Sequence, residues 1–130
     1  MRSSLMIAAA LTMACSSHAL ARPMTLAEQL AVENAVKQRL KDPESARFRH
    51  PKINVPAGDA GVFYCGFVNS KNSYGGYAGD AEFAVGFATE IKNGKPDTLA
   101  NVIEIGDADP DSEDSQVMRK LCARFPNLHS

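Results

Sequence analysis

Three strand-like runs between residues 61 and 105 constrain the fold of this chain more than any other feature. The first, Gly61 to Asn69 (GVFYCGFVN), has apolar residues on both faces, which is typical of a strand covered on both sides. The second and third, Glu82 to Ile91 and Leu99 to Ile105, flank the pair Asn93-Gly94, the best short hairpin signal. Strands joined by hairpins pair antiparallel, so we expect one antiparallel sheet.

A helical pattern precedes these strands. Thr25 and Glu28 form a capping-box pair, and Pro43 ends the helix because the residue before a proline avoids helical angles. Asp42 can cap a new short turn, which an extended piece from Arg47 to Val55 follows. The apolar face of the first helix is predicted to comprise Leu26, Leu30, Val36 and Leu40, with Ala27, Ala31 and Ala35.

A second helical pattern closes the chain, from Ser115 to Phe125. Its predicted buried face comprises Val117, Met118, Leu121, Cys122 and Phe125. The fold class is therefore α+β: an antiparallel sheet of three to four strands with an N-terminal and a C-terminal helix packed on it. A chain of 130 residues suits one such domain.

The first 21 residues have the layout of a secretory signal peptide. Arg2 supplies the positive charge, Leu5 to Ala14 forms a short apolar run, and Ala19-Leu20-Ala21 matches an A-x-A cleavage site. We therefore expect residues 1–21 to be removed and residues 22–130 to form a single exported domain, periplasmic or secreted.

An alternative interpretation makes Cys15 the lipid-bearing cysteine of a lipoprotein, although Thr12 stands where such signals usually have leucine. Without residues 1–21 the formal charge is 13 − 15 = −2. This weakly acidic balance favours neither nucleic acid nor an anionic membrane as partner. The apolar run Leu5 to Ala14 is too short to span a bilayer as a helix. We also expect no transmembrane segment in the mature chain.

Two cysteines, Cys65 and Cys122, remain in the expected mature chain. In an oxidising compartment such a pair predicts a disulfide, worth about 4 kcal/mol in the chain-entropy model because the loop it closes is long. The alternative is a cysteine nucleophile at Cys65, activated by His50 with Asn69 or Asn72 as the orienting group.

Neither a metal nor a cofactor is predicted. The expected mature chain has only His50 and His129, which do not have the spacing of a zinc site. The acidic run Asp107 to Asp114 resembles the start of a calcium loop, but Ser112 and Met118 occupy the positions where an EF-hand has glycine and glutamate. The other interpretation of this run is an acidic cap at the start of the last helix.

The segment Asn69 to Asp80 (NSKNSYGGYAGD) is the candidate binding loop. Its glycines permit tight reversals, and its tyrosines offer flat amphipathic surface with little rotamer entropy to lose. Alternatively it is a long hairpin connection whose tyrosines fold back onto the sheet. The predicted binding residues are Asn72, Tyr74, Gly75, Gly76 and Tyr77.

Arg47 and Arg49 lie at strand spacing and would share one face. Such a pair can clamp a carboxylate or phosphate, or it can be a solvated face with weak ion pairs.

Residues 40–49 (LKDPESARFR) and 65–83 (CGFVNSKNSYGGYAGDAEF) resemble a group of small exported bacterial proteins with KDP-x-SA-x-FR and CG-x-VN-x-KNS-YGGY-x-G segments. The resemblance implies an exported bacterial protein and supplies no catalytic residue.

From these observations we predict a non-enzymatic binding or inhibitor-like module that acts through the Tyr/Gly/Asn loop on an envelope protein or a saccharide. Two alternatives stay open: a small envelope hydrolase using Cys65 or a carboxylate, and a structural component of the envelope.

Overall fold

The computed structural model describes residues 23–51 and 61–124. The predicted signal peptide and residues 52–55 of the predicted extended piece lie outside these ranges. The elements, in chain order, are α1 (Leu26–Lys37), a 3₁₀ turn η1 (Pro43–Ser45), β1 (Arg47–Arg49), β2 (Val62–Asn69), β3 (Ala81–Lys92), β4 (Lys95–Ile105) and α2 (Glu113–Ala123).

The strands form one antiparallel sheet in the order β1-β2-β3-β4. Asn93 and Gly94 join β3 to β4 with φ angles of 52° and 75°, the left-handed values that the predicted hairpin turn requires. Pairing begins directly at Lys95, so β4 starts before the predicted Leu99. The α+β prediction, with one helix before and one after the sheet, is confirmed.

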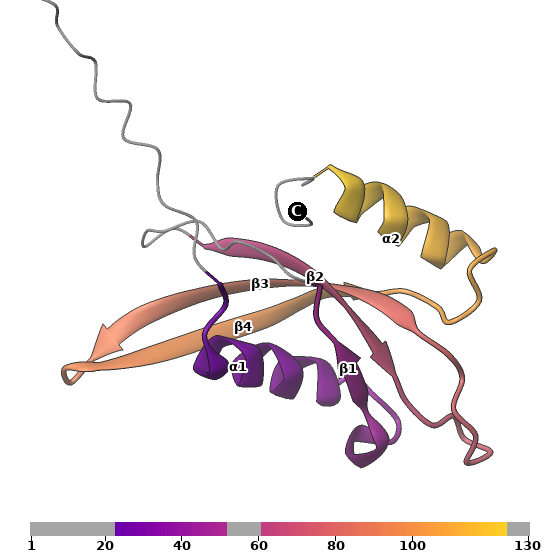
Figure 1. The fold of residues 1–130 in the computed structure, drawn as a ribbon, viewed down its shortest axis with the longest axis horizontal. Coiled ribbons are helices and arrows are strands. Elements are labelled where there is room, and N and C mark those ends of the chain that lie inside the picture. Colours follow the sequence, from indigo (N-terminus) through magenta and orange to yellow (C-terminus); the bar gives the residue numbers. More distant parts are fainter. Residues whose placement is uncertain (1–22, 52–60, 125–130) are drawn as a thin grey trace, which may run out of the picture.

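The two helices lie on opposite faces of this curled sheet (Figure 1). Side chains alternate along β2, so Tyr64 packs with Val32 of α1 while Cys65 packs with Met118 of α2. The prediction that this strand is covered on both sides is therefore confirmed. The larger core, between α1 and the sheet, consists of Val32, Val36, Val62, Tyr64, Val68, Phe83, Val85 and Phe87.

The buried face of α1 differs from the predicted one. The capping box between Thr25 and Glu28 forms as expected, and Val36 is buried. However, Leu26 and Leu30 are 69% and 49% exposed and Ala27 is exposed as well, while Glu28 and Val32 are buried in their place. Residues four apart share a helix face, so the stripe that faces the sheet begins at Glu28, inside the capping box.

The predicted buried face of α2 is also wrong in one position. Met118 and Cys122 are buried, but Val117 is 54% exposed. The Cys65–Cys122 disulfide fixes the rotation of the helix, and Val117 then projects away from the sheet. The helix begins at Glu113, after the N-cap Ser112, and Phe125 lies outside the described residues.

Candidate functional site

The connection between β2 and β3, residues 70–80, is called the tyrosine loop below. The Asn72 Oδ1 atom accepts hydrogen bonds from the backbone N–H groups of Tyr74 (3.0 Å) and Gly76 (3.2 Å). Gly75 has a φ of 81°, which glycine adopts without strain. The tip of the loop thus has a defined conformation set by its own asparagine and glycine.

The base of the tyrosine loop is tied to the rest of the domain. The Asn69 Oδ1 atom accepts a hydrogen bond from the Gly79 N–H at 3.0 Å. The Ser45 Oγ atom of η1 accepts one from the Lys71 N–H at 2.8 Å. Since η1 and β2 hold the loop from two sides, its tip is presented on a rigid support.

The two tyrosines of the loop have different surroundings. Tyr74 is 97% exposed, whereas Tyr77 is 37% exposed. The Arg47 guanidinium carbon lies 4.0 Å from the centre of the Tyr77 ring, and Lys71 Nζ lies 5.7 Å from it. Tyr77 therefore folds back toward β1, and Tyr74 projects into solvent.

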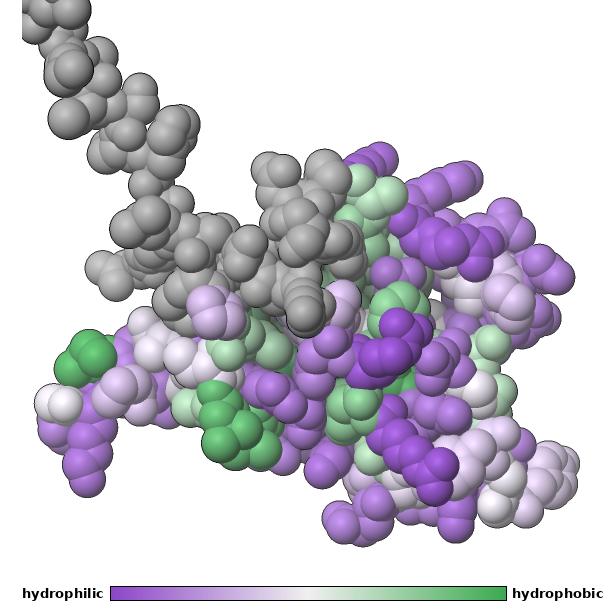
Figure 2. Space-filling view, viewed as in Figure 1, coloured by the Kyte–Doolittle hydropathy of each residue, from purple (hydrophilic) through white to green (hydrophobic). Residues whose placement is uncertain are grey.

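The five predicted binding residues accordingly divide by position. Asn72 and Gly75 shape the backbone, Tyr77 packs beneath Arg47, and Tyr74 and Gly76 lie at the exposed tip. Figure 2 shows the end of the molecule that carries the loop as pale to purple, in keeping with its polar composition.

Both arginines of β1 already contact protein groups. Arg49 lies over the Phe67 ring, with its guanidinium carbon 4.0 Å from the ring centre. The same guanidinium forms an ion pair with Asp80, with Nη2 and Oδ2 3.1 Å apart. Arg47 and Arg49 share an exposed face, as predicted, but each is held by an aromatic ring rather than paired with the other as a clamp.

A cluster of three polar side chains, Glu33, His50 and Tyr64, lies inside the domain. No sequence motif indicated this cluster. His50, which follows β1, contacts Glu33 of α1 through Nε2 (2.7 Å) and Tyr64 of β2 through Nδ1 (2.5 Å). The side chains of Glu33 and His50 are mostly buried, and Tyr64 is fully buried. The ring of Phe48 stacks against His50. This cluster ties three elements together.

The proton positions in this cluster follow from its chemistry. Burial raises the pKa of the Tyr64 phenol, and the nearby Glu33 charge raises it further, so Tyr64 stays protonated at neutral pH. The Glu33 carboxylate can only accept a hydrogen bond, so His50 Nε2–H donates to it. In the neutral tautomer of His50 that donates through Nε2–H, Nδ1 accepts from the Tyr64 O–H. Because Tyr64 is buried and protonated, it is not a nucleophile.

The cysteine-nucleophile alternative is not supported by these positions. Among residues 23–51 and 61–124, His50 is the only histidine, and it contacts Tyr64 on the face of the sheet that α1 covers. Cys65 points to the opposite face and is bonded to Cys122. A sulfur in a disulfide has no thiolate with which to attack.

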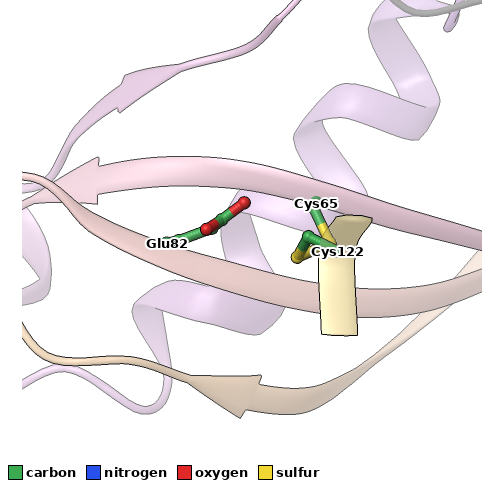
Figure 3. A group of neighbouring side chains, drawn as sticks. All are labelled: Cys65, Glu82 and Cys122. Atoms are coloured by element: carbon green, nitrogen blue, oxygen red, sulfur yellow. A yellow bond between two sulfur atoms is a disulfide. The ribbon is translucent and has the colours of Figure 1, made fainter. Parts of the chain in front are cut away.

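The disulfide has a carboxylate beside it. Glu82 of β3 lies next to Cys65 and Cys122 (Figure 3), and the two sulfurs and one Glu82 carboxylate oxygen are all within 4.8 Å of one another. Cys122 and Glu82 also line a groove of about 560 Å³ between α2 and the sheet, with Phe67 and Arg119. Sequence spacing could not reveal this group, because its members come from three separate elements.

The acidic run, residues 107–114, leads into α2 and ends in its first turn. Asp107 and Asp109 accept hydrogen bonds from the backbone N–H groups two residues ahead, at 2.9 and 3.0 Å. Ser112 caps the helix, and Glu113 and Asp114 occupy its first turn, where they complement the helix dipole. These contacts agree with the interpretation of the acidic run as a cap at the start of the last helix.

Comparisons of this chain with models of known protein families, with curated proteins and with solved structures give no match. No helix within the described residues has the length and apolar character needed to cross a membrane.

Proposed function

We propose that this protein is an exported binding module that contacts its partner through the tip of the tyrosine loop, with Tyr74 as the central contact. The observation that carries the proposal is the 97% exposure of Tyr74 on a loop whose backbone is fixed by Asn72 and Asn69. An exposed aromatic ring on a rigid support loses little entropy on binding.

The groups around the tip suit a polar partner. Lys41 Nζ lies 3.2 Å from Ser73 Oγ at the tip, and Arg47 and Lys71 flank Tyr77 at its base. Aromatic rings beside hydrogen-bonding and cationic side chains are typical of surfaces that bind proteins or saccharides. We therefore propose an envelope protein or a saccharide as partner.

Export is supported by the covalent bond between Cys65 and Cys122. Disulfides persist in oxidising compartments and are rare in the cytosol. The signal-peptide pattern of residues 1–21, and the resemblance of residues 40–49 and 65–83 to exported bacterial proteins, point the same way.

Site-specific photo-crosslinking tests the proposal. Tyr74 is replaced by a photo-reactive phenylalanine analogue in the protein expressed in its own cell envelope. Ile91, 70% exposed at the hairpin end of β3, carries the same analogue as a matched control. We expect a discrete crosslinked species from position 74 and none from position 91.

A second measurement separates contact from architecture. Tyr74→Ala should abolish capture of the crosslinked partner by the purified protein and leave the thermal unfolding midpoint unchanged. If neither position crosslinks, or if Tyr74→Ala captures the partner as well as the unchanged chain does, the tyrosine loop is architectural and the envelope-component alternative is favoured.

A further inference from the structure

Three ligand-type side chains converge on the face of the sheet that α2 covers. Cys65 comes from β2, Glu82 from β3 and Cys122 from α2 (Figure 3). The two sulfurs and one carboxylate oxygen are within 4.8 Å of one another, and both cysteines are almost fully buried. Since paired strands and a packed helix hold the three residues, their Cα positions are set by the fold rather than by a mobile loop.

We propose that reduction of the Cys65–Cys122 disulfide converts this cluster into a zinc site, with the two thiolates and the Glu82 carboxylate as its ligands. The proposal does not rest on the proposed function, because none of the three ligands belongs to the tyrosine loop, residues 70–80, although Asp80 of that loop lines the same groove. The oxidised and metal-bound states exclude each other, because a disulfide sulfur has no thiolate to offer.

The geometry required is close to the geometry present. Zinc binds thiolates at about 2.3 Å and carboxylates at about 2.1 Å in tetrahedral sites, which places neighbouring ligand atoms roughly 3.5 to 3.8 Å apart. The Cα atoms of the two cysteines are 6.1 Å apart. Rotations about the Cα–Cβ bonds can therefore bring the sulfurs to this spacing from the Cα positions of the oxidised structure.

The groove beside α2 supplies an entry path and a fourth position. Cys122 and Glu82 line this groove, so a metal ion and a water molecule can reach the cluster from solvent. Arg119 lines the same groove, together with the carboxylates of Asp80 and Asp107. Three protein ligands plus an open position is a recurring arrangement for zinc.

The redox step balances with a dithiol as the reductant. The dithiol gives two electrons and two protons, the Cys65–Cys122 bond breaks, and the reductant closes to its own cyclic disulfide. Zinc then displaces the two thiol protons and binds the thiolates. Soft thiolates combined with one carboxylate oxygen favour Zn²⁺ over the harder Mg²⁺ and Ca²⁺ ions, which prefer all-oxygen sites.

Cobalt substitution provides the test. The purified protein is reduced with dithiothreitol, freed of the reductant under anaerobic conditions and titrated with Co²⁺ as a spectroscopic stand-in for Zn²⁺. We expect thiolate-to-cobalt charge-transfer absorption that saturates at one ion per chain, and its displacement by Zn²⁺. The oxidised protein should show no such absorption. Zinc should also prevent the reduced protein from re-forming its disulfide until a chelator is added.

Matched variants identify the ligands. Glu82→Gln keeps the shape of the side chain but removes the charged ligand, and should weaken Co²⁺ binding by about 10-fold or more. Glu90→Gln, at the exposed far end of β3, should bind as the unchanged chain does. Cys122→Ser should lose most of the charge-transfer absorption.

Two outcomes overturn the proposal. One is a reduced protein that keeps its helical circular dichroism but shows no charge-transfer absorption. The other is a Glu82→Gln variant with unchanged affinity. If reduction unfolds the domain, zinc must restore the fold, because metal binding energy then appears as folding energy; failure to refold equally excludes the site.

Discussion

The two faces of the sheet hold their helices by different means. On the α1 face, large side chains such as Tyr64 and Phe83 pack against Val32 and Val36, and the Glu33–His50–Tyr64 hydrogen bonds add a polar connection. On the α2 face the buried cluster is small and is closed by a covalent bond. It comprises Cys65, Ala84, Met118 and Cys122.

This difference shows how a small domain can attach a second helix when little apolar surface is available for it. Burial of apolar area stabilises in proportion to that area, so the small α2 cluster contributes less than the α1 core. The disulfide compensates for this smaller contribution, because it lowers the conformational entropy of the unfolded chain. We therefore expect α1 to depend on packing and α2 to depend on oxidation.

The largest expected effect is loss of the disulfide. The double change Cys65→Ala with Cys122→Ala should lower the free energy of unfolding by about 4 kcal/mol, because the cysteines are 57 residues apart in sequence. Hydrogen exchange should accelerate in α2 while α1 retains protection. Equal loss of protection in both helices would contradict the comparison.

The polar connection on the α1 face can be broken at one atom. Tyr64→Phe removes the hydroxyl and leaves His50 Nδ1 largely buried without its donor. We expect a loss of about 1–3 kcal/mol in the free energy of unfolding, measured with urea. Tyr77→Phe serves as the control and should change stability by less than about 0.5 kcal/mol.

Each face also has a glycine against which a side chain packs closely. A methyl group at Gly66 would lie 2.6 Å from the Phe83 ring, and one at Gly106 would lie 2.9 Å from Met118. Gly66→Ala and Gly106→Ala should each cost about 1–3 kcal/mol of unfolding free energy. At Gly86 the nearest atom is 3.9 Å away, so Gly86→Ala should be nearly neutral.

Alkaline pH should affect the α1 face through Tyr64. Its pKa is raised in the folded state, so the unfolded chain releases this proton first as the pH rises. The stabilisation from the protonated Tyr64 phenol is fully present below the pKa of tyrosine in the unfolded chain, about 10. Above that pH it falls by about 1.4 kcal/mol per pH unit. Unfolding in urea between pH 9 and roughly pH 11 measures this slope. The Tyr64→Phe variant should show a shallower slope, and an unchanged one would contradict the assignment.

The smallest expected effect on stability lies outside both faces. Tyr74→Ala removes a ring that is 97% exposed, so the free energy of unfolding should change by less than about 0.5 kcal/mol. A larger loss would mean that the tip of the tyrosine loop contributes to the fold, and would count against its role as a presented contact.

Local patterns predicted much of the fold. Thr25 with Glu28, Asp42 before Pro43, and Asn93 with Gly94 each act over a few residues, and each forms the cap or turn expected of it. The pairing of Cys65 with Cys122 was also predicted, from the number of cysteines and the expected compartment.

Helix rotation was predicted less well, because it depends on what a helix packs against. The apolar stripe of α1 could be drawn through Leu26 or through Val32, and only contact with β3 and β4 selects Val32. For the same reason Val117 was placed on the buried face of α2, although the disulfide turns it outward.

The sequence by itself determined the order of helices and strands, the hairpin turn and the cysteine pair, because capping, turn geometry and periodicity are local properties. The tertiary structure decided which polar groups meet. His50 contacts Glu33 and Tyr64, and Glu82 lies beside the two cysteines, across separations that no local pattern records. Alternation along β2 sends Tyr64 and Cys65 to opposite faces, and the packing of α1 and α2 then supplies each with its neighbours.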